Sequence, residues 1–388
     1  MRKSAIVLSC VLSGLTIHGA AHPAPSAIVQ FVFTSDSHFG LKRTSFRGKE
    51  NVNAAEVNEA LVQAINALPV ARIPKDGGIG AATLVGAIDF VANTGDIANR
   101  QETTEAGQIQ TASESWAEFE RIYLRGVHVT DQAGLPAPVF AVPGNHDVSN
   151  AIGFHKLMTP ASDAASLVGL YNLMVRPRVP MTPATFSYPR DRVHTARDIG
   201  GVHFVFLTVW PDSAQRAWME RDLASIPADA PVIVVTHDQP DAEAKHFSNP
   251  NGKRDINAID KFENLLVDRL QDGPSIDVPA TMEHSELERF ILAHPNVTAY
   301  FHGNSNWNQF YDWTGPHQTI ALHVFRVDSP IKGDVSGIDE TKLSFQLATI
   351  DMTSRRLTVR EVLWNAHGGG IDWGGSTTVA LSPRPRRQ

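Results

Sequence analysis

Four short apolar runs in this chain are each followed by a residue that can bind a metal ion or donate a proton. The runs are rich in β-branched and aromatic residues, a pattern that favours buried β-strands. They occupy residues 31–33, 90–94, 139–142 and 232–236. Ligands of open α/β sheets collect beyond the carboxyl ends of the strands, so several such ends can direct side chains at one centre. We therefore expect an α/β fold with a site at that edge.

The residues after these runs carry carboxylate, amide or imidazole groups. They are Asp36 and His38 after the first run, Asp96 after the second, Asn145, His146 and Asp147 after the third, and His237 after the fourth. Asp36 and His38 alone would also suit an ordinary turn after a strand. The Asn145-His146-Asp147 group has no simple turn explanation. Because all four groups occur in order, each after a predicted strand, together they predict a metal site.

Helical segments alternate with these strands. A helix is predicted over residues 50–68, where apolar residues recur at helical spacing before Pro69. Others are predicted over residues 116–122, after Asp212 or Ser213 as the N-cap, and after a capping box at Ser285. Apolar and polar residues alternate in the runs at 319–325, 343–349 and 357–363. We expect these runs to be antiparallel strands that complete a second sheet. The alternation indicates a layered α/β arrangement.

The ordered motifs resemble the calcineurin-like phosphoesterase (metallophosphoesterase) superfamily, whose signature is Asp-x-His, Gly-Asp, Gly-Asn-His-Asp or -Glu, a lone His and Gly-His-x-His. The resemblance spans roughly residues 28–306 and includes residues 215–219, which look like the Gln-x-x-Trp-Leu helix of the family. Four of the five blocks are present; the fifth reads Gly303-Asn304-Ser305-Asn306. The resemblance implies an α/β fold, a four-layer αββα sandwich of two mixed β-sheets flanked by helices.

The resemblance also implies the ligands of two divalent metal ions, Mn, Fe, Zn or Mg. Asp96 would bridge the metals, with Asp36 and His38 on the first and Asn145 and His237 on the second. His146 resembles the proton donor or phosphate-contacting residue of the family, and Asp147 would orient its imidazole, because a catalytic histidine needs its tautomer fixed.

Asn304 and Asn306 stand where the family carries two histidine ligands. An amide oxygen is a weaker donor than an imidazole nitrogen and suits harder cations. Three outcomes are open: the amides bind a labile Mn-like or Mg-like ion, His302 or His317 substitutes, or one metal is lost. We expect at least one metal to remain because the upstream ligands are intact.

The resemblance implies a metal-dependent phosphoesterase that cleaves a small phosphodiester or phosphomonoester by attack of a metal-bound hydroxide. The alternative is a non-catalytic binding protein of the same fold that has lost a working metal pair. A nuclease is disfavoured, because the net charge of −7 offers no basic stripe for nucleic acid. The oligomeric state is open.

The first 21 residues resemble a secretory signal peptide. Arg2 and Lys3 precede an apolar run at residues 5–17 and small residues at 19–21. This run is shorter than the roughly 20 apolar residues that a membrane span needs. We therefore expect a periplasmic or secreted protein without a membrane anchor after signal removal. The only cysteine, Cys10, lies inside this leader, so the mature chain would have no disulfide.

The rest of the chain is expected to form one phosphoesterase domain over residues 28–365. An irregular insertion at 238–282 starts beside the site, where His246, Lys253 and Arg254 are candidate substrate contacts. Residues 366–388 are expected to be a loose tail. Four aromatic residues crowd the segment after Asn306 and could line a pocket for a base or aryl group or simply pack beneath the loop: Trp307, Phe310, Tyr311 and Trp313.

Overall fold

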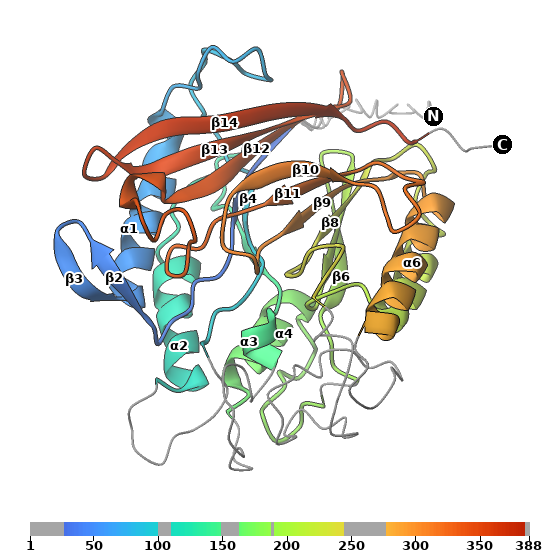
Figure 1. Ribbon diagram of the computed structural model, residues 1–388, viewed down its shortest axis with the longest axis horizontal. Coiled ribbons are helices and arrows are strands. Elements are labelled where there is room, and N and C mark those ends of the chain that lie inside the picture. Colours follow the sequence, from blue (N-terminus) through green and yellow to red (C-terminus); the bar gives the residue numbers. More distant parts are fainter. Residues whose placement is uncertain (1–26, 100–109, 149–162, 188–189, 244–276, 385–388) are drawn as a thin grey trace, which may run out of the picture.

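Two six-stranded β-sheets lie face to face in the middle of the molecule (Figure 1). The computed structural model describes residues 27–99, 110–148, 163–187, 190–243 and 277–384. The first sheet contains β1 (Ile28–Thr34), β4 (Phe90–Asn93), β5 (Val139–Ala141), β12 (Ser344–Asp351), β13 (Arg356–Ala366) and β14 (Gly370–Ala380). The second contains β6 (His194–Ile199), β7 (Val202–Leu207), β8 (Val232–Val235), β9 (Val297–His302), β10 (Gln309–Trp313) and β11 (Leu322–Arg326).

Both sheets mix parallel and antiparallel strands. In the first, with the order β14-β13-β12-β1-β4-β5, the strands β1, β4 and β5 run parallel and the others antiparallel. In the second, with the order β10-β11-β9-β8-β7-β6, the four central strands run parallel and the two edge strands antiparallel. A separate hairpin joins β2 (Lys42–Phe46) to β3 (Lys49–Asn53). The carboxyl ends of the parallel strands therefore lie at the same edge of each sheet.

Aromatic side chains fill the space between the two sheets. Phe31 of β1 stacks on Phe90 of β4 with ring centroids 4.6 Å apart. It also meets Phe204 and Phe301 of the second sheet at 5.6 and 5.3 Å, in edge-to-face geometry. All four rings are fully buried. Because central strands are covered on both faces, they need continuous apolar residues, and every residue of β8 is buried accordingly.

Helices cover the outer face of each sheet, which gives four layers (Figure 1). Over the first sheet lie α1 (Ala54–Ala67), α2 (Ala112–Phe119) and the π-helical turn η2 (Glu120–Leu124). Over the second lie α5 (Ser213–Leu223) and α6 (Asp277–Ala293). The remaining helical segments are η1 (Leu68–Val70), α3 (Asn145–Val148), α4 (Ala165–Val175) and η4 (Glu340–Lys342). The predicted αββα sandwich is confirmed.

Several predicted helix boundaries change in the structure. The helix expected from residue 50 begins at Ala54, because residues 49–53 pair with β2. The cap expected at Asp212 is present, and its carboxylate accepts a hydrogen bond from the Gln215 backbone. The capping box predicted at Ser285 is wrong, because α6 already begins at Asp277. For the same reason residues 277–282 are helical and do not belong to an irregular insertion.

The carboxyl-terminal strands also differ from the prediction. β11 is parallel to β9, and β12 and β13 extend the sheet of β1 instead of completing the second sheet. The loose tail predicted from residue 366 is wrong for residues 370–380, which form β14 and pair antiparallel with β13. The backbone reverses at His367, Gly368 and Gly369, all with positive φ. These residues form a hairpin turn, and the chain beyond them returns along the sheet.

Several expectations fall on other parts of the chain. The signal peptide predicted at 1–21 and the candidate contacts His246, Lys253 and Arg254 lie outside the described residues. Within the described ranges, no helix combines the length and the apolar character that crossing a bilayer requires.

Candidate metal centre

The loops after the parallel strands converge on Asp96. The backbone N–H of His38, after β1, donates to the carbonyl of Asp96, after β4, over 2.8 Å. From the second sheet, Nδ1 of His237 lies 2.6 Å from the carbonyl of Thr94, and the Gly303 N–H donates to the carbonyl of His237 over 2.9 Å. Loops of both sheets are thus connected by hydrogen bonds at one edge of the sandwich.

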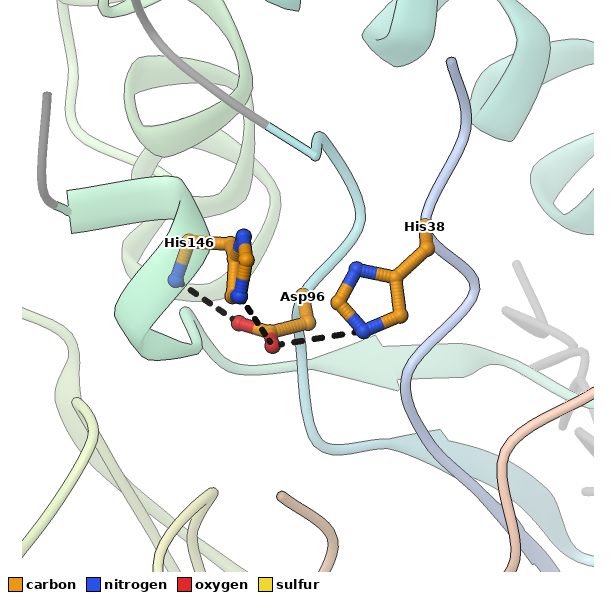
Figure 2. Close-up of side chains that lie close together, drawn as sticks. All are labelled: His38, Asp96 and His146. Carbon is orange, nitrogen blue, oxygen red and sulfur yellow. Dashed lines mark hydrogen bonds and ion pairs between the residues drawn. The ribbon is translucent and has the colours of Figure 1, made fainter. Parts of the chain in front are cut away.

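The carboxylate of Asp96 stands between three imidazoles. Its Oδ1 lies 3.4 Å from Nε2 of His237, and its Oδ2 lies 3.6 Å from Nε2 of His38. Nε2 of His146 lies 3.9 Å from the same Oδ2, and Figure 2 shows His38 and His146 on opposite sides of Asp96. Because its two oxygens face different histidines, Asp96 has the arrangement of a bridging ligand.

The other predicted upstream ligands, Asp36 and Asn145, also lie in this cluster. Oδ1 of Asp36 lies 3.6 Å from Nε2 of His38. Oδ1 of Asn145, at the start of α3, lies 2.8 Å from Nε2 of His237. Two groups of side chains offer ligand atoms within 4.8 Å of one another: Asp36, Asp96 and His237, and His38, Asp96 and His146. Asp96 belongs to both groups.

The backbone of these loops takes a left-handed conformation at the ligand positions. Asp36, His38 and Asp96 have φ of 56°, 41° and 49°. Such values cost L-residues roughly 1–2 kcal/mol each and concentrate at functional sites. Glycine is needed at positions 144 and 303, because the carboxylates lie against the backbone there. A Cβ on Gly144 would overlap the carboxylate of Asp96, and a Cβ on Gly303 would overlap that of Asp36. The two glycines permit this close approach.

The cluster fits divalent cations. Asp36 and His38 are buried, yet Oδ1 of Asp36 and both ring nitrogens of His38 have no hydrogen-bond partner among the described residues. A buried polar atom without a partner is costly unless something coordinates it. Carboxylate oxygens and imidazole nitrogens together suit Zn, Fe and Mn. The donor set and its unpartnered atoms are those of a metal site.

Burial and charge set the protonation of the cluster. Burial raises the pKa of Asp96, and the nearby charges of Asp36 and Asp147 raise it further. Burial acts on Asp36 too, but His38 and His237 outweigh it and lower its pKa. Burial lowers the pKa of His38 to about 3, to which the charge of Lys332 contributes. These opposed shifts arise from several charges buried together, an arrangement that a bound cation would change strongly.

His146 and Asp147 have different surroundings. Nδ1 of His146 lies 2.7 Å from the carbonyl of Asn99, which orients the ring. The carboxylate of Asp147 instead accepts hydrogen bonds from the backbone N–H groups of Ile97, Ala98 and Gly144. Asp147 therefore holds the Asp96 loop against the loop of Asn145. Its predicted role in orienting His146 is wrong, because the Asn99 carbonyl occupies that position.

The two asparagines of the fifth motif sit at the margin of the cluster. The backbone N–H of Asn304 donates to Oδ2 of Asp36 over 3.0 Å, while its side-chain amide donates to Asp238 over 2.8 Å. The amide of Asn306 donates to the carbonyl of Asn304 over 2.9 Å. Both residues have φ near 60°, which asparagine tolerates well. The amide nitrogen of Asn306 thus bonds within its own loop, that of Asn304 bonds to the loop after β8, and the backbone of Asn304 reaches Asp36.

Neither suggested replacement histidine is available. The ring nitrogens of His302 lie 2.9 Å from the carbonyl of Gly303 and 3.0 Å from the hydroxyl of Tyr311. His317 lies at the surface, where it pairs with Glu288 at 2.7 Å. Both nitrogens of His302 are engaged and His317 pairs elsewhere, so these two histidines do not replace the missing ligands.

Lys332 is a site residue that the sequence reasoning missed. Its Nζ lies 3.2 Å from Nε2 of His146. Its backbone N–H donates to Oγ of Ser329, and the Ser329 hydroxyl donates to the carbonyl of Asp36. The signal in the sequence was that Ser329 and Lys332 follow the strand predicted over residues 319–325. In the structure this strand is β11, which is parallel to β9 and has its carboxyl end at this edge.

The fold and the site together define an α/β sandwich with a candidate metal centre formed by loops of both sheets. The family model for calcineurin-like phosphoesterases matches residues 29–303, and the chain belongs to this family. No curated protein matches the chain significantly.

Three solved structures are similar over most of the chain. A structure of PhoD is 12% identical with a TM-score of 0.49, covering 93% of this chain and 72% of that one. A Vps29 single mutant from Entamoeba histolytica is 10% identical with a TM-score of 0.33, covering 90% and 99%. Vps29 from Chaetomium thermophilum is 7% identical with a TM-score of 0.31, covering 92% and 97%.

Proposed function

We propose that the protein hydrolyses a small phosphodiester or phosphomonoester with the help of divalent cations. The observation that carries this proposal is the position of Asp96, whose oxygens lie 3.4 Å from His237 and 3.6 Å from His38. Membership of the calcineurin-like phosphoesterase family supports hydrolase chemistry on phosphoesters. The unpartnered nitrogens of buried His38 support cation binding at this place.

Four side chains would hold cations on the two sides of Asp96: Asp36, His38, Asn145 and His237. We propose two ions, with Mn, Fe, Zn and Mg as candidates. Bound cations of this kind polarise the ester and lower the pKa of a water molecule to near neutrality. Asp96 would bind between the ions, because each of its oxygens already faces a different imidazole.

His146 would give a proton to the leaving alcohol. Its Nδ1 faces the carbonyl of Asn99 and therefore carries a proton, so Nε2 is the nitrogen that exchanges protons. Burial, followed by the charge of Lys332, holds the pKa of His146 well below its usual value. His146 therefore rests neutral and needs a nearby proton source. The ammonium of Lys332, 3.2 Å from Nε2, is suited to that task and to contact with a phosphoryl oxygen.

The rival function is a binding protein that has lost its metal pair. The asparagines at 304 and 306 were its support in the sequence. The intact cluster of Asp36, His38, Asp96 and His237 does not favour it, because a binding protein has no need for buried ligands without partners.

One experiment separates the two functions. Purified protein is dialysed against Mn, Zn, Fe or Mg, its metal content is measured, and hydrolysis of bis(4-nitrophenyl) phosphate and 4-nitrophenyl phosphate is followed. We expect stoichiometric metal and cleavage of at least one ester; the preferred ester decides between diesterase and monoesterase. Protein without stoichiometric metal or turnover would establish the binding function. Plasmid DNA, tested in parallel, should remain intact.

We also propose that the protein is exported to the periplasm or secreted. The leader at residues 1–21 supports this proposal through its basic start and apolar run. Amino-terminal sequencing of protein from the extracytoplasmic fraction should find a mature chain that starts near residue 22. An intact leader on protein confined to the cytoplasm would contradict export.

A further inference from the structure

The peptide unit between Ser37 and His38 is held from two sides. Its N–H, on His38, donates to the carbonyl of Asp96 over 2.8 Å. Its C=O, on Ser37, accepts a hydrogen bond from Nδ2 of Asn58 over 2.9 Å. A peptide unit is planar, so bonds at both of its polar groups fix its rotation. That rotation determines φ of His38, which is 41°, and with it the direction in which the imidazole leaves the loop.

Asn58 connects this peptide unit to the helix layer of the first sheet. It lies on α1 and is fully buried. Its Nδ2 donates not only to the carbonyl of Ser37 but also to that of Ala54, the first residue of the helix, over 2.9 Å. The amide of Asn58 therefore ties the loop that carries Asp36 and His38 to the first turn of a helix of 14 residues.

Tyr123 determines which end of the Asn58 amide faces the loop. Its hydroxyl donates to Oδ1 of Asn58 over 2.8 Å, so Nδ2 is the end that points at Ser37. With the amide reversed, its oxygen would face the carbonyl oxygen of Ser37, and the Tyr123 hydroxyl would lose its acceptor. Oγ of Ser37 in turn donates to the Tyr123 hydroxyl over 3.4 Å. The three side chains thus form one closed set of hydrogen bonds beneath the ligand loop.

A π-helical turn places Tyr123 at this position. The turn η2 continues α2 directly, and within it the N–H of Arg125 donates to the carbonyl of Glu120, five residues earlier, over 2.9 Å. A π-turn adds one residue to a helical turn and so changes the direction of the side chains on it; such turns are frequent at functional sites. The ring of Tyr123 stacks on that of Phe119 with centroids 4.9 Å apart. Stacking and the π-turn together hold the hydroxyl at Asn58.

The fold alone does not require a polar pair at this place. Asn58 and Tyr123 are fully buried, and Tyr123 belongs to the apolar cluster that also contains Val57 and Leu61 of α1. Replacing both partners of a buried hydrogen bond by apolar groups of the same shape is often nearly neutral for stability. Apolar residues here, however, would leave the carbonyl of Ser37 without its bond to Asn58. The pair therefore serves the ligand loop.

We propose that Asn58 and Tyr123 are positioning residues of the candidate metal centre. They set the affinity for the cation that Asp36 and His38 would hold. Tyr123 acts through the amide of Asn58, and Asn58 acts through the peptide unit before His38. The proposal rests on the proposed function, because it assigns a role in holding the cations of the same site. Groups that orient metal ligands typically contribute about 10–100-fold to metal affinity.

Binding of Mn²⁺ tests the proposal without any turnover. The metal-free full chain and its variants are titrated with Mn²⁺ by calorimetry. Asn58→Leu removes the bond to Ser37 at nearly the same side-chain size, and we expect it to weaken one bound ion by at least about tenfold. Tyr123→Phe removes only the hydroxyl, and its loss should be about fivefold, the equivalent of one hydrogen bond. Equal weakening of two bound ions would assign the pair to the fold as a whole and overturn the proposal.

The matched control is Asn66→Leu, near the other end of α1. Asn66 also donates to a carbonyl, that of Gly126, and accepts from an N–H, that of His128, each over 2.7 Å. Because these bonds are remote from the ligand loop, the control should bind Mn²⁺ as the wild type does. Urea titration of the metal-free proteins completes the comparison, since a purely structural role would lower the free energy of unfolding and leave the Mn²⁺ affinity unchanged.

Combining the two substitutions tests whether Tyr123 acts through Asn58. In the double variant, Tyr123→Phe should cost no further Mn²⁺ affinity, because the amide that the hydroxyl orients is gone. Additive losses would mean two independent effects and would overturn the proposed order of action. Unchanged affinity in a folded Tyr123→Phe protein would overturn the proposal even if Asn58→Leu fails to fold.

Failure of this inference is distinguishable from failure of the proposed function. If the wild type hydrolyses bis(4-nitrophenyl) phosphate while both folded variants bind Mn²⁺ as it does, only the positioning role is wrong. If the variants lose Mn²⁺ affinity as expected while the wild type cleaves no ester, the positioning role holds and the enzyme proposal fails.

Discussion

Nζ of Lys332 lies 3.2 Å from Nε2 of His146, although 186 positions separate the two residues in the chain. Nδ1 of the same ring faces the carbonyl of Asn99 at 2.7 Å. The imidazole is therefore held between an acceptor and a donor, with Nε2 accepting from the ammonium. This geometry fixes the ring and lets the ammonium of Lys332 supply a proton to Nε2 of His146, as proposed above.

Replacement of Lys332 tests this relationship. Lys332→Met should lower kcat by about 10²-fold, the lower end of the range for assisted proton transfer. It should also change the pH profile of kcat, because the charge that lowers the pKa of His146 is removed. Lys332→Arg keeps the charge but does not release a proton, so it should restore the pH profile more than the rate. Equal losses in both variants, with an unchanged pH profile, would mean that Lys332 only supports the fold.

Loss of Asp96, the proposed bridging carboxylate, should remove metal and activity together. Asp96→Asn keeps the size of the side chain but removes the charge that lies between His38 and His237. We expect its metal content to fall to background by elemental analysis and its turnover to vanish. A chelator should lower the melting temperature of the wild type, since a bound ion stabilises only the folded state, and leave that of Asp96→Asn nearly unchanged. Full metal content in this variant would exclude the bridging role.

Loss of the His146 imidazole should separate binding from chemistry. His146→Ala should keep its metal and lose about 10²–10⁴-fold in kcat, the usual contribution of a general acid. Elemental analysis and steady-state kinetics on one preparation measure both quantities. If His146→Ala loses as much metal as Asp96→Asn, His146 is a ligand and not the proton donor. The test is needed because Nε2 of His146 lies only 3.9 Å from Oδ2 of Asp96, which is close enough for both side chains to bind one ion.

The sequence predicted that the upstream candidate residues would come together at one place, for a local reason. Asp36, Asp96 and His237 each lie within three residues of the end of a strand whose apolar run is readable without knowing its partners. Because these strands are parallel neighbours in two stacked sheets, their ends meet as expected. The four layers followed from the resemblance to the family.

The parts that were missed depend on long-range pairing. An alternating pattern indicates which face of a strand is buried but not which strand lies beside it. The sheet of β12 and the direction of β11 were therefore mistaken, and with them the position of Lys332. The tail was called loose because of its glycines, although Gly368 and Gly369 form the turn that returns β14 to the sheet.

Asp328, next to Ser329 in the loop after β11, should make stability depend on pH. Burial raises the pKa of this carboxyl to about 8, although Arg43 opposes the shift. In the unfolded chain the pKa of aspartate is about 3.9. Between these values the folded state holds a proton that the unfolded state releases. The stabilising contribution is therefore complete below about pH 4 and is lost as the pH rises toward 8.

Comparison of Asp328→Asn with the wild type measures this effect. The asparagine is neutral at every pH, so the free energy of unfolding of the wild type relative to the variant should fall between pH 5 and pH 8. The slope is at most about 1.4 kcal/mol per pH unit. Urea titrations of both proteins in metal-free buffer at four pH values measure this difference in the free energy of unfolding. Asp351→Asn is the control: the hydrogen bond from Ser354 lowers the pKa of Asp351, so its contribution should stay constant over this range. A flat difference for Asp328→Asn would show that this buried carboxyl is ionised in the folded protein, with Arg43 as its counter-charge.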